Sequence, residues 1–370
     1  MIKENGVEPL VVALASDDDT IPYALTRWPL LEPDMAHRLS TVARQLPAWL
    51  GLRAAETGFW LAGRHRWALS ELRKAKPHFV LANDWPALIV ASAWKAESGA
   101  AIHYDTHEFA TLEFDERLWW RTVYKPFVTQ LEKKHILNAD SVSTVGTLLG
   151  RELQKLYQLP NMPGVVRNTP NAIDLADDYK THWPLRILYH GQVINDRGIE
   201  TLIDSMVHWN EPHTLIIRGS GSSAYIASLK QRVARNGHTL RVAFEAAVPP
   251  DEVIRKASTT ADVGVHFTPL ETKQRHFSMP NKLFEYIGAG LAVAVSPGAD
   301  LKDIVESHGV GVVSTDASAE AAAIAINGLS QTSVSAFRKA ARKAARTLSW
   351  ESEKRVLNEI IRPLLTYPNS

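Results

Sequence analysis

The stretch SMPNKLFEYIGAGLAVAV, residues 278–295, contains the clearest structural signal in the chain. Pro280 suits the first turn of a helix, where its missing N–H costs nothing, and Ser278 can serve as the N-cap. The glycines that follow can end the helix and let another backbone or a ligand come close. The apolar run Leu291–Val295 then predicts a buried strand.

The polar residues of this helix suggest a chemistry. Lys282 and Glu285 are three residues apart and share one face, whereas Leu283 and Ile287 point toward the core. A helix N-terminus offers free N–H groups and a positive dipole end to a phosphate, and a carboxylate one turn further can accept hydrogen bonds from sugar hydroxyls. The pattern suits a phosphorylated sugar compound. It equally fits an ordinary amphipathic helix with a Lys–Glu surface pair.

Outside this stretch, short β-branched runs alternate with longer helical patterns, which predicts parallel, doubly wound α/β sheets. In the first half the expected strands are residues 10–15, 79–82, 101–104, 141–145 and 165–167. In the second half they are residues 187–190, 214–217, 240–244, 263–267, 291–295 and 311–314. Residues from Ala319 onward predict helices.

Composition restricts the function classes. The chain has 370 residues and a formal net charge of +1, so it is long enough for two domains and has no bulk attraction to nucleic acid. It contains no cysteine, which excludes disulfides and thiolate chemistry. The N-terminal stretch MIKENGVEPL has no signal-peptide core, and the apolar run 85–94 is about half a membrane span. We therefore expect a cytoplasmic location.

Five further motifs occur in order along the chain: YDTHE (104–108), VVRNTP (165–170), HGQVINDRGIETLI (190–203), RGSG (218–221) and ADVGVHFTP (261–269). Together with PNKLFEYIGAG, they resemble retaining glycosyltransferases of family 4, in the subgroup with a PNKLFEY sequence. The resemblance implies the GT-B fold, in which two Rossmann-like domains face a cleft. It also implies a sugar nucleotide bound mainly by the C-terminal domain.

A polar segment that ends in Trp183-Pro184 predicts a linker over residues 171–184. With the resemblance, the expected domains are an acceptor-side domain over residues 1–170, a donor-binding domain over 185–345, and a C-terminal helix over 346–370 that crosses back to the first domain. Members of the family usually begin with a strand, a glycine-rich loop and a helix before the strand that Leu10–Ala15 resembles. Only nine residues precede Leu10 here, so the first β-α unit is expected to be missing, or to lie upstream.

The resemblance also assigns roles to residues. Glu285 would hold the ribose, His107 would face the transferred sugar, and Arg197 would neutralise the diphosphate; these three form the expected catalytic set. Gln192 stands where the family usually has Arg, and Phe277 where it has a first acid, with Glu271 as a substitute. The expected donor-binding residues are Gly191, Gln192, Arg197, Gly219, Gly221, Asn281, Lys282, Leu283 and Glu285. The glycine pair also fits a plain turn.

We therefore expect transfer of a sugar, with retention, from a nucleoside-diphosphate sugar to a saccharide or lipid-linked acceptor, as a step in cell-surface polysaccharide synthesis, without metal or other cofactor. The alternatives are a non-catalytic or impaired sugar-nucleotide-binding protein and a nicotinamide-dependent enzyme with Glu245 on the ribose. Asp17–Asp19 could indicate a metal motif of the GT-A fold, but fits a solvated loop better. The basic stretches 64–78 and 117–135 can sit on anionic lipid at the inner face of a membrane, or form ordinary helices with a charged face.

Overall fold

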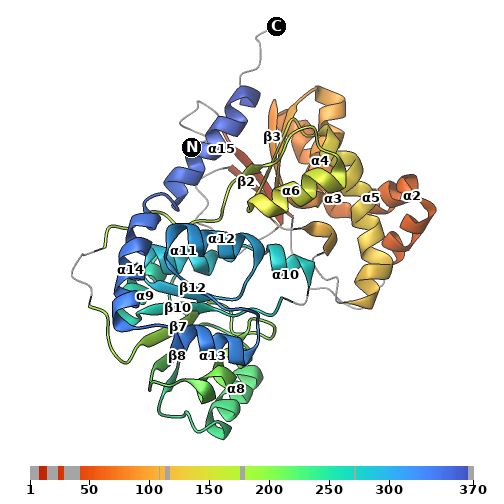
Figure 1. The fold of residues 1–370 in the computed structure, drawn as a ribbon. Helices are drawn as coiled ribbons and strands as arrows, with labels where there is room; N and C mark the ends of the chain where they lie inside the picture. The colour runs from red at the N-terminus through yellow and green to blue at the C-terminus, as the bar shows by residue number, and fades with distance from the viewer. Residues whose placement is uncertain are drawn as a thin grey trace. The chain divides into compact units, whose positions relative to one another are not determined.

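The computed structural model describes residues 8–14, 24–28, 42–107, 109–112, 117–175, 180–270 and 272–365. The chain forms two compact units, one of residues 1–166 with 354–370 and the other of residues 167–353. Each is an α/β unit with parallel strands (Figure 1). By these bounds the expected linker, 171–184, falls inside the second unit, and the end of the C-terminal helix groups with the first.

The first unit contains two parallel sheets. A two-stranded sheet pairs β1 (Leu10–Leu14) with β2 (Ala24–Trp28), and a four-stranded sheet has the order β3 (Phe79–Asn83), β4 (Ala101–Thr106), β5 (Ser141–Thr144) and β6 (Gly164–Val165). All five strands expected from the sequence are present, with shifts of one or two residues at their ends. Strand β2 was not expected, because ALTRW has no alternation of apolar and polar residues.

Helices cover the first unit and form its core. They are η2 (Leu46–Leu50), α2 (Leu52–Trp60), α3 (Gly63–Ala75), α4 (Asp84–Ser98), η3 (Ala110–Leu112), the π-helical turn η4 (Trp120–Tyr124), α5 (Lys125–His135), η5 (Ile136–Asn138), α6 (Thr147–Tyr157) and most of α15 (Trp350–Leu365). Phe59, Trp85, Ile89 and Leu131 belong to one buried cluster that joins α2, α4 and α5. In Figure 1, α2 lies at the outer edge of this unit, beside α5.

The second unit is built on a six-stranded parallel sheet with the order β12-β11-β10-β7-β8-β9. The strands are β7 (Arg186–His190), β8 (Thr214–Arg218), β9 (Val242–Glu245), β10 (Val263–His266), β11 (Ala292–Val295) and β12 (Gly311–Val313). These are the six strands expected in this half. Their apolar side chains pack on both faces, as parallel strands require.

The helices of the second unit connect these strands. They are α7 (Ile199–Ser205), η6 (Met206–His208), α8 (Ser223–Arg235), α9 (Val253–Thr260), α10 (Lys273–Phe277), α11 (Asn281–Gly288), α12 (Ala299–His308), α13 (Ala319–Asn327), α14 (Gln331–Ala345) and the start of α15. One local expectation was wrong. Ser278 is the C-cap of α10, and Pro280 itself is the N-cap of α11, because α10 occupies the residues immediately before it.

Candidate active site

The order of strands in the second unit defines where a ligand can bind. The chain begins this sheet at β7, adds β8 and β9 on one side, and then β10, β11 and β12 on the other. The carboxyl ends of β7 and β10 therefore flank a topological switch point, where open α/β sheets bind their ligands. The loop after β7 and the N-terminus of α11 both lie at this edge.

Lys282, in the first turn of α11, lies against the loop after β7. Its Nζ is 4.0 Å from the ring centre of Tyr189, a cation–π contact, and a methyl group added to Gly191 would lie 3.5 Å from it. Burial, and then the charge of Arg197, lowers the pKa of Lys282 from 10.5 to about 7, although Glu285 opposes the shift. The ammonium group is thus held in a desolvated position beside a glycine backbone.

Arg197 adds a second positive charge at this edge. It is exposed in the loop before α7, and its charge also contributes, after burial and Lys282, to lowering the pKa of His266. Among the described residues, neither Arg197 nor Lys282 has a carboxylate within ion-pair distance, whereas the adjacent Asp196 pairs with Arg275 at 3.3 Å. This edge of the sheet therefore holds two positive charges that lack an ion-pair partner among the described residues, as a phosphate site requires.

The first turn of α11 adds peptide N–H groups to these charges. The helix begins at Asn281, and no side chain caps it. Asn281 is exposed, so its side chain can reach a ligand. Leu283 cannot act in the same way, because its side chain is fully buried and its N–H donates to Pro280 O at 3.0 Å. We interpret Leu283 as a packing residue.

Glu285 lies one turn further along α11 and is held beside the end of β7. Its Oε2 is 3.0 Å from His190 Nε2, a close approach that lacks hydrogen-bond alignment. The carboxylate is 31% exposed, so it can still accept hydrogen bonds from a ligand. The Lys–Glu surface pair considered from the sequence is absent among the described contacts, since Lys282 lies over Tyr189 instead.

The buried Tyr286 of α11 connects this helix to the strands beneath it. Sequence reasoning did not identify it. Its hydroxyl accepts from His190 N at 3.0 Å and lies 3.3 Å from Val265 O, so it bridges β7 and β10. Its ring stacks on the His190 imidazole with centroids 4.5 Å apart. The signal in the sequence was Gly264, where an added Cβ would lie 2.2 Å from the Tyr286 ring.

The two glycines after β8 have a packing role. A Cβ at Gly219 would lie 1.7 Å from Gly191 O, and one at Gly221 would lie 2.0 Å from Val193 O. The β7 and β8 loops also share the hydrogen bond Val193 N to Ser220 O, at 2.8 Å. These glycines therefore let the two loops pack backbone to backbone. Gln192 projects from the packed loop and is exposed, while its carbonyl accepts from Tyr189 Oη at 2.7 Å.

His107 belongs to the first unit and follows β4. Its Nε2 lies 3.2 Å from Asp105 Oδ2, and its Nδ1 lies 3.6 Å from Asp84 Oδ1. Asn83, just before Asp84, pairs with Asp105 across β3 and β4. Asp84, Asp105 and His107 therefore lie together at the carboxyl edge of this sheet. The imidazole is 33% exposed and oriented by two carboxylates.

Several candidate acidic residues cannot be placed. Asp17–Asp19, Glu108 and Glu271 lie outside the described residues. Phe277, which stands where the family usually has an acid, is the last residue of α10 and contacts the His276 ring. Within the described residues no group of three His, Asp or Glu side chains could hold a metal ion.

Comparisons with known proteins agree with this architecture. Residues 184–332 match the family model described as Glycosyl transferases group 1. The comparison with curated protein sequences found no significant match.

Three solved structures are similar to the chain. One is sucrose-phosphate synthase from Thermosynechococcus elongatus (18% identity, TM-score 0.67, covering 84% of this chain and 79% of that one). Another is HepE of Anabaena in complex with UDP (14% identity, TM-score 0.63, covering 96% and 98%). The third is a glycosyltransferase from Rickettsia africae (12% identity, TM-score 0.69, covering 100% and 93%). These likenesses confirm the predicted fold class, an α/β protein of the GT-B kind with two Rossmann-like units. That the units face a cleft stays a prediction.

Proposed function

We propose that this chain is a retaining glycosyltransferase that moves a sugar from a nucleoside-diphosphate sugar to a saccharide or lipid-linked acceptor, as a step in cell-surface polysaccharide synthesis. The observation that carries the proposal is the pair of cations, Lys282 and Arg197, at the switch point of the second sheet. Lys282 Nζ lies over the Tyr189 ring and beside Gly191, and Arg197 is near enough for its charge to lower the pKa of Lys282. The family match over residues 184–332 supports the same assignment.

The proposed roles follow from charge. When the bond between the sugar and the diphosphate breaks, its electron pair stays on the phosphate oxygen. The acceptor oxygen forms the new bond to the same carbon, and the proton of the acceptor hydroxyl passes to the leaving phosphate oxygen. Arg197, Lys282 and the first amides of α11 would stabilise the charge on the leaving diphosphate. Because fixed protein cations do this, no metal is needed in the proposal. We assign no enzyme nucleophile.

Glu285 would accept hydrogen bonds from the ribose hydroxyls, since its carboxylate is partly exposed and held one turn from Lys282. Gln192 and Asn281 would add neutral hydrogen bonds to the donor, and Gly191 would let the backbone approach the diphosphate. His107, oriented by Asp84 and Asp105, would contact the transferred sugar from the first unit. The acceptor would bind on that unit as well.

The nicotinamide alternative finds less support. The ribose ligand it needs was expected at Glu245, but that carboxylate accepts from the buried Arg218 Nε at 2.8 Å. The glycines at 219 and 221 are in turn occupied by packing of the two loops. A non-catalytic sugar-nucleotide-binding protein is the remaining second candidate, because Gln192 and Phe277 replace charges that the resembled family usually has.

The test is a thermal-shift screen against sugar nucleotides, followed by a transfer assay. UDP-sugars are the first probes, because the similar HepE structure is a complex with UDP. We expect a raised melting temperature that persists in chelator, and transfer with retained anomeric configuration. Binding without transfer to any saccharide or lipid-linked acceptor would favour the non-catalytic alternative. A strict need for manganese or magnesium would contradict the proposed chemistry.

A further inference from the structure

One face of the four-stranded sheet in the first unit carries a run of polar side chains. His103, Asp105 and His107 alternate along β4 and just beyond it, and β4 is an interior strand of this sheet. Across the neighbouring strand β5, Ser141 is paired with His103, and Ser143 is paired with Asp105. We call Ser141, His103, Ser143 and Asp105 the β4–β5 ladder. His103 and Ser143 are fully buried, so each needs hydrogen-bond partners to offset the cost of leaving water.

The ladder forms a continuous chain of hydrogen bonds. Ser141 Oγ lies 2.8 Å from His103 Nδ1, and His103 Nε2 lies 3.0 Å from Ser143 Oγ. The Ser143 hydroxyl donates to Asp105 Oδ1. The other carboxylate oxygen, Asp105 Oδ2, lies 3.2 Å from His107 Nε2. The chain therefore leads from the buried sheet to the partly exposed imidazole of His107.

The chemistry of each group fixes the direction of donation along the ladder. Burial lowers the pKa of His103 to about 4, although Asp105 opposes the shift, so this imidazole is neutral near pH 7 and has one N–H. Ser143 has a single proton, which it gives to Asp105, so its oxygen must accept from His103 Nε2–H. His103 Nδ1 must then accept from the Ser141 hydroxyl. Every donation along the ladder is thus directed toward Asp105.

This direction decides the tautomer of His107. An ionised carboxylate can only accept, so Asp105 Oδ2 requires a proton on His107 Nε2, and Nδ1 of the neutral ring is then an acceptor. That nitrogen lies 3.6 Å from Asp84 Oδ1, an acceptor on a side chain that is 62% exposed. The backbone of Asp84 has φ +64°, a conformation that is unfavourable for residues other than glycine and is found at functional sites. The edge of the sheet therefore offers two neighbouring acceptors, which suit hydroxyl groups.

We propose that Ser143 and His103 are positioning residues, which hold Asp105 so that His107 keeps its proton on Nε2 and presents Nδ1 as an acceptor to a sugar hydroxyl. The identity of this ligand rests on the proposed function, whereas the position of the proton is a property of the free chain. A ladder that only stabilised the sheet would need hydrogen bonds, but it would not need to fix the tautomer of His107.

The experiment is nitrogen-15 NMR of the histidine side chains in the full chain, at about pH 9, above the ordinary imidazole pKa of about 6.5. The nitrogen shifts distinguish a protonated from an unprotonated ring nitrogen, and the spectrum of His107→Gln identifies the His107 signals. We expect the Nε2–H form of His107 in the unchanged chain. Ser143→Ala should give a mixture of both tautomers, because the Asp105 carboxylate loses the bond that fixes its other oxygen. Ser143→Thr, which keeps the hydroxyl, should keep the Nε2–H form.

Asp105→Asn tests the direction of donation. Because Ser143 donates, the new amide oxygen should face Ser143 and the new NH₂ group should face His107. The proton of His107 should therefore move to Nδ1. Adding Ser143→Ala to this variant frees the amide to turn, so the Nε2–H form should return in part. An Asp105→Asn chain that keeps only the Nε2–H form of His107 would overturn the proposal.

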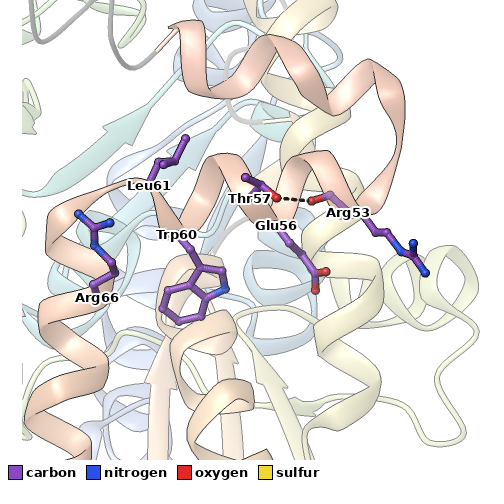
Figure 2. Close-up of a pocket in the computed structure, with 6 residues that line it drawn as sticks. All are labelled: Arg53, Glu56, Thr57, Trp60, Leu61 and Arg66. Atoms are coloured by element: carbon purple, nitrogen blue, oxygen red, sulfur yellow. Dashed lines mark hydrogen bonds between the residues drawn. The ribbon is translucent and has the colours of Figure 1, made fainter.

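Two matched controls remove hydroxyl groups elsewhere. The hydroxyl of Thr57 donates to Arg53 O at 2.9 Å on α2, beside a shallow surface pocket (Figure 2). The hydroxyl of Ser205 is fully buried in the second unit and donates to Leu202 O at 2.7 Å. Thr57→Val and Ser205→Ala should leave the His107 tautomer unchanged, even where the melting temperature falls.

A transfer assay gives a second measurement. Ser143→Ala should lower kcat/KM for sugar transfer by about two- to tenfold, the contribution of one hydrogen bond, and should leave the Kd of UDP unchanged. The proposal is overturned if His107 in the unchanged chain carries its proton on Nδ1 or on both nitrogens, or if Ser143→Ala lowers only the melting temperature. If the chain transfers no sugar, the proposed function fails, and the NMR result still decides the positioning role.

Discussion

The two ends of strands β7 and β10 hold positive charges in opposite ways. At the amino ends, the buried Asp262 accepts hydrogen bonds from the charged side chains Arg186 Nε at 3.2 Å and Arg338 Nη1 at 2.9 Å, and from the backbone N–H of Arg186 at 3.0 Å. At the carboxyl ends, Lys282 and Arg197 have no carboxylate within ion-pair distance among the described residues.

The difference separates structure from function. Burial alone would raise the pKa of Asp262, but hydrogen bonds from Arg186 and His182 outweigh it, and the pKa is lowered. At the other end, burial and Arg197 lower the pKa of Lys282, and Glu285 opposes them only in part, so the charged form is disfavoured in the free protein. A satisfied charge cluster stabilises the fold, whereas an unsatisfied one is ready to bind an anion.

The largest expected effect is on stability, at the amino ends of β7 and β10, where Asp262 pairs with the arginines. Replacing Asp262 by Ala would leave Arg186 and Arg338 without their shared acceptor, and removing one partner of a buried ion pair costs about 3–5 kcal/mol. Chemical denaturation should show this loss in the free energy of unfolding of the second unit. Asp204→Ala is the matched control, because its pair with Arg232 is partly exposed and should contribute less than about 1 kcal/mol. Equal effects of the two substitutions would contradict the comparison.

The next largest effect is on ligand binding, and we expect it at Glu285, near the carboxyl ends of β7 and β10. Glu285→Gln should weaken UDP and uridine alike, by about tenfold to a hundredfold, because hydrogen bonds to a charged acceptor contribute about 1.5–3 kcal/mol. Calorimetric titration of both ligands measures this. Glu306→Gln, on the exposed side of α12, should change neither. If only UDP weakened, Glu285 would not contact the ribose.

A pH dependence follows from the lowered pKa of Lys282, about 7. Above that pH the free protein loses the ammonium charge, so UDP binding must take up a proton. UDP affinity should fall by up to tenfold per pH unit between pH 7.5 and 9, where the UDP phosphates stay ionised. Calorimetric titrations of UDP in buffers of different ionisation enthalpy would measure the number of protons taken up on binding.

The lowered pKa of Lys282 makes UDP affinity fall as pH rises, but it makes the stability of the free protein rise. Between pH 7 and about 10 the unfolded chain keeps the Lys282 proton and the folded one does not, so the free protein gains stability as pH rises. Lys282→Arg, which stays charged, should bind UDP without this pH slope. A flat UDP affinity in the unchanged chain over this range would show that Lys282 lies outside the diphosphate site.

The smallest expected effect comes from Gln192. Gln192→Arg would add a charge at the exposed tip of the β7 loop, where the resembled family usually has one. We expect UDP to bind about fivefold more tightly, because an exposed added charge contributes about 1 kcal/mol or less. Surface plasmon resonance with UDP and uridine would measure this change, and the affinity for uridine should stay the same. Weaker UDP binding would show that the loop is directed away from the diphosphate.

The sequence was informative where structure is local. Alternating strands and helices, the helix after Pro280 and the placement of Lys282 and Glu285 all follow from short patterns. Tyr286 was missed because its role depends on a hydroxyl that reaches two strands distant in sequence. The glycines at 219 and 221 looked like a ligand turn, but only the folded loops reveal that they accommodate another backbone. Whether Lys282 has an ion-pair partner also depends on residues that are distant in the sequence, so the sequence alone could not predict it.

The central claim is that the unpaired cations of the second unit bind a diphosphate. It is tested most directly by calorimetric titration of UDP and of uridine into the unchanged chain, Arg197→Ala and Lys282→Met. Lys282→Met should weaken UDP by about thirtyfold or more, since losing a buried charged contact costs about 2–5 kcal/mol. Arg197→Ala removes an exposed charge and should weaken UDP by about fivefold. Both substitutions should leave uridine within about twofold. Equal weakening of UDP and uridine, or no weakening of either, would contradict the claim.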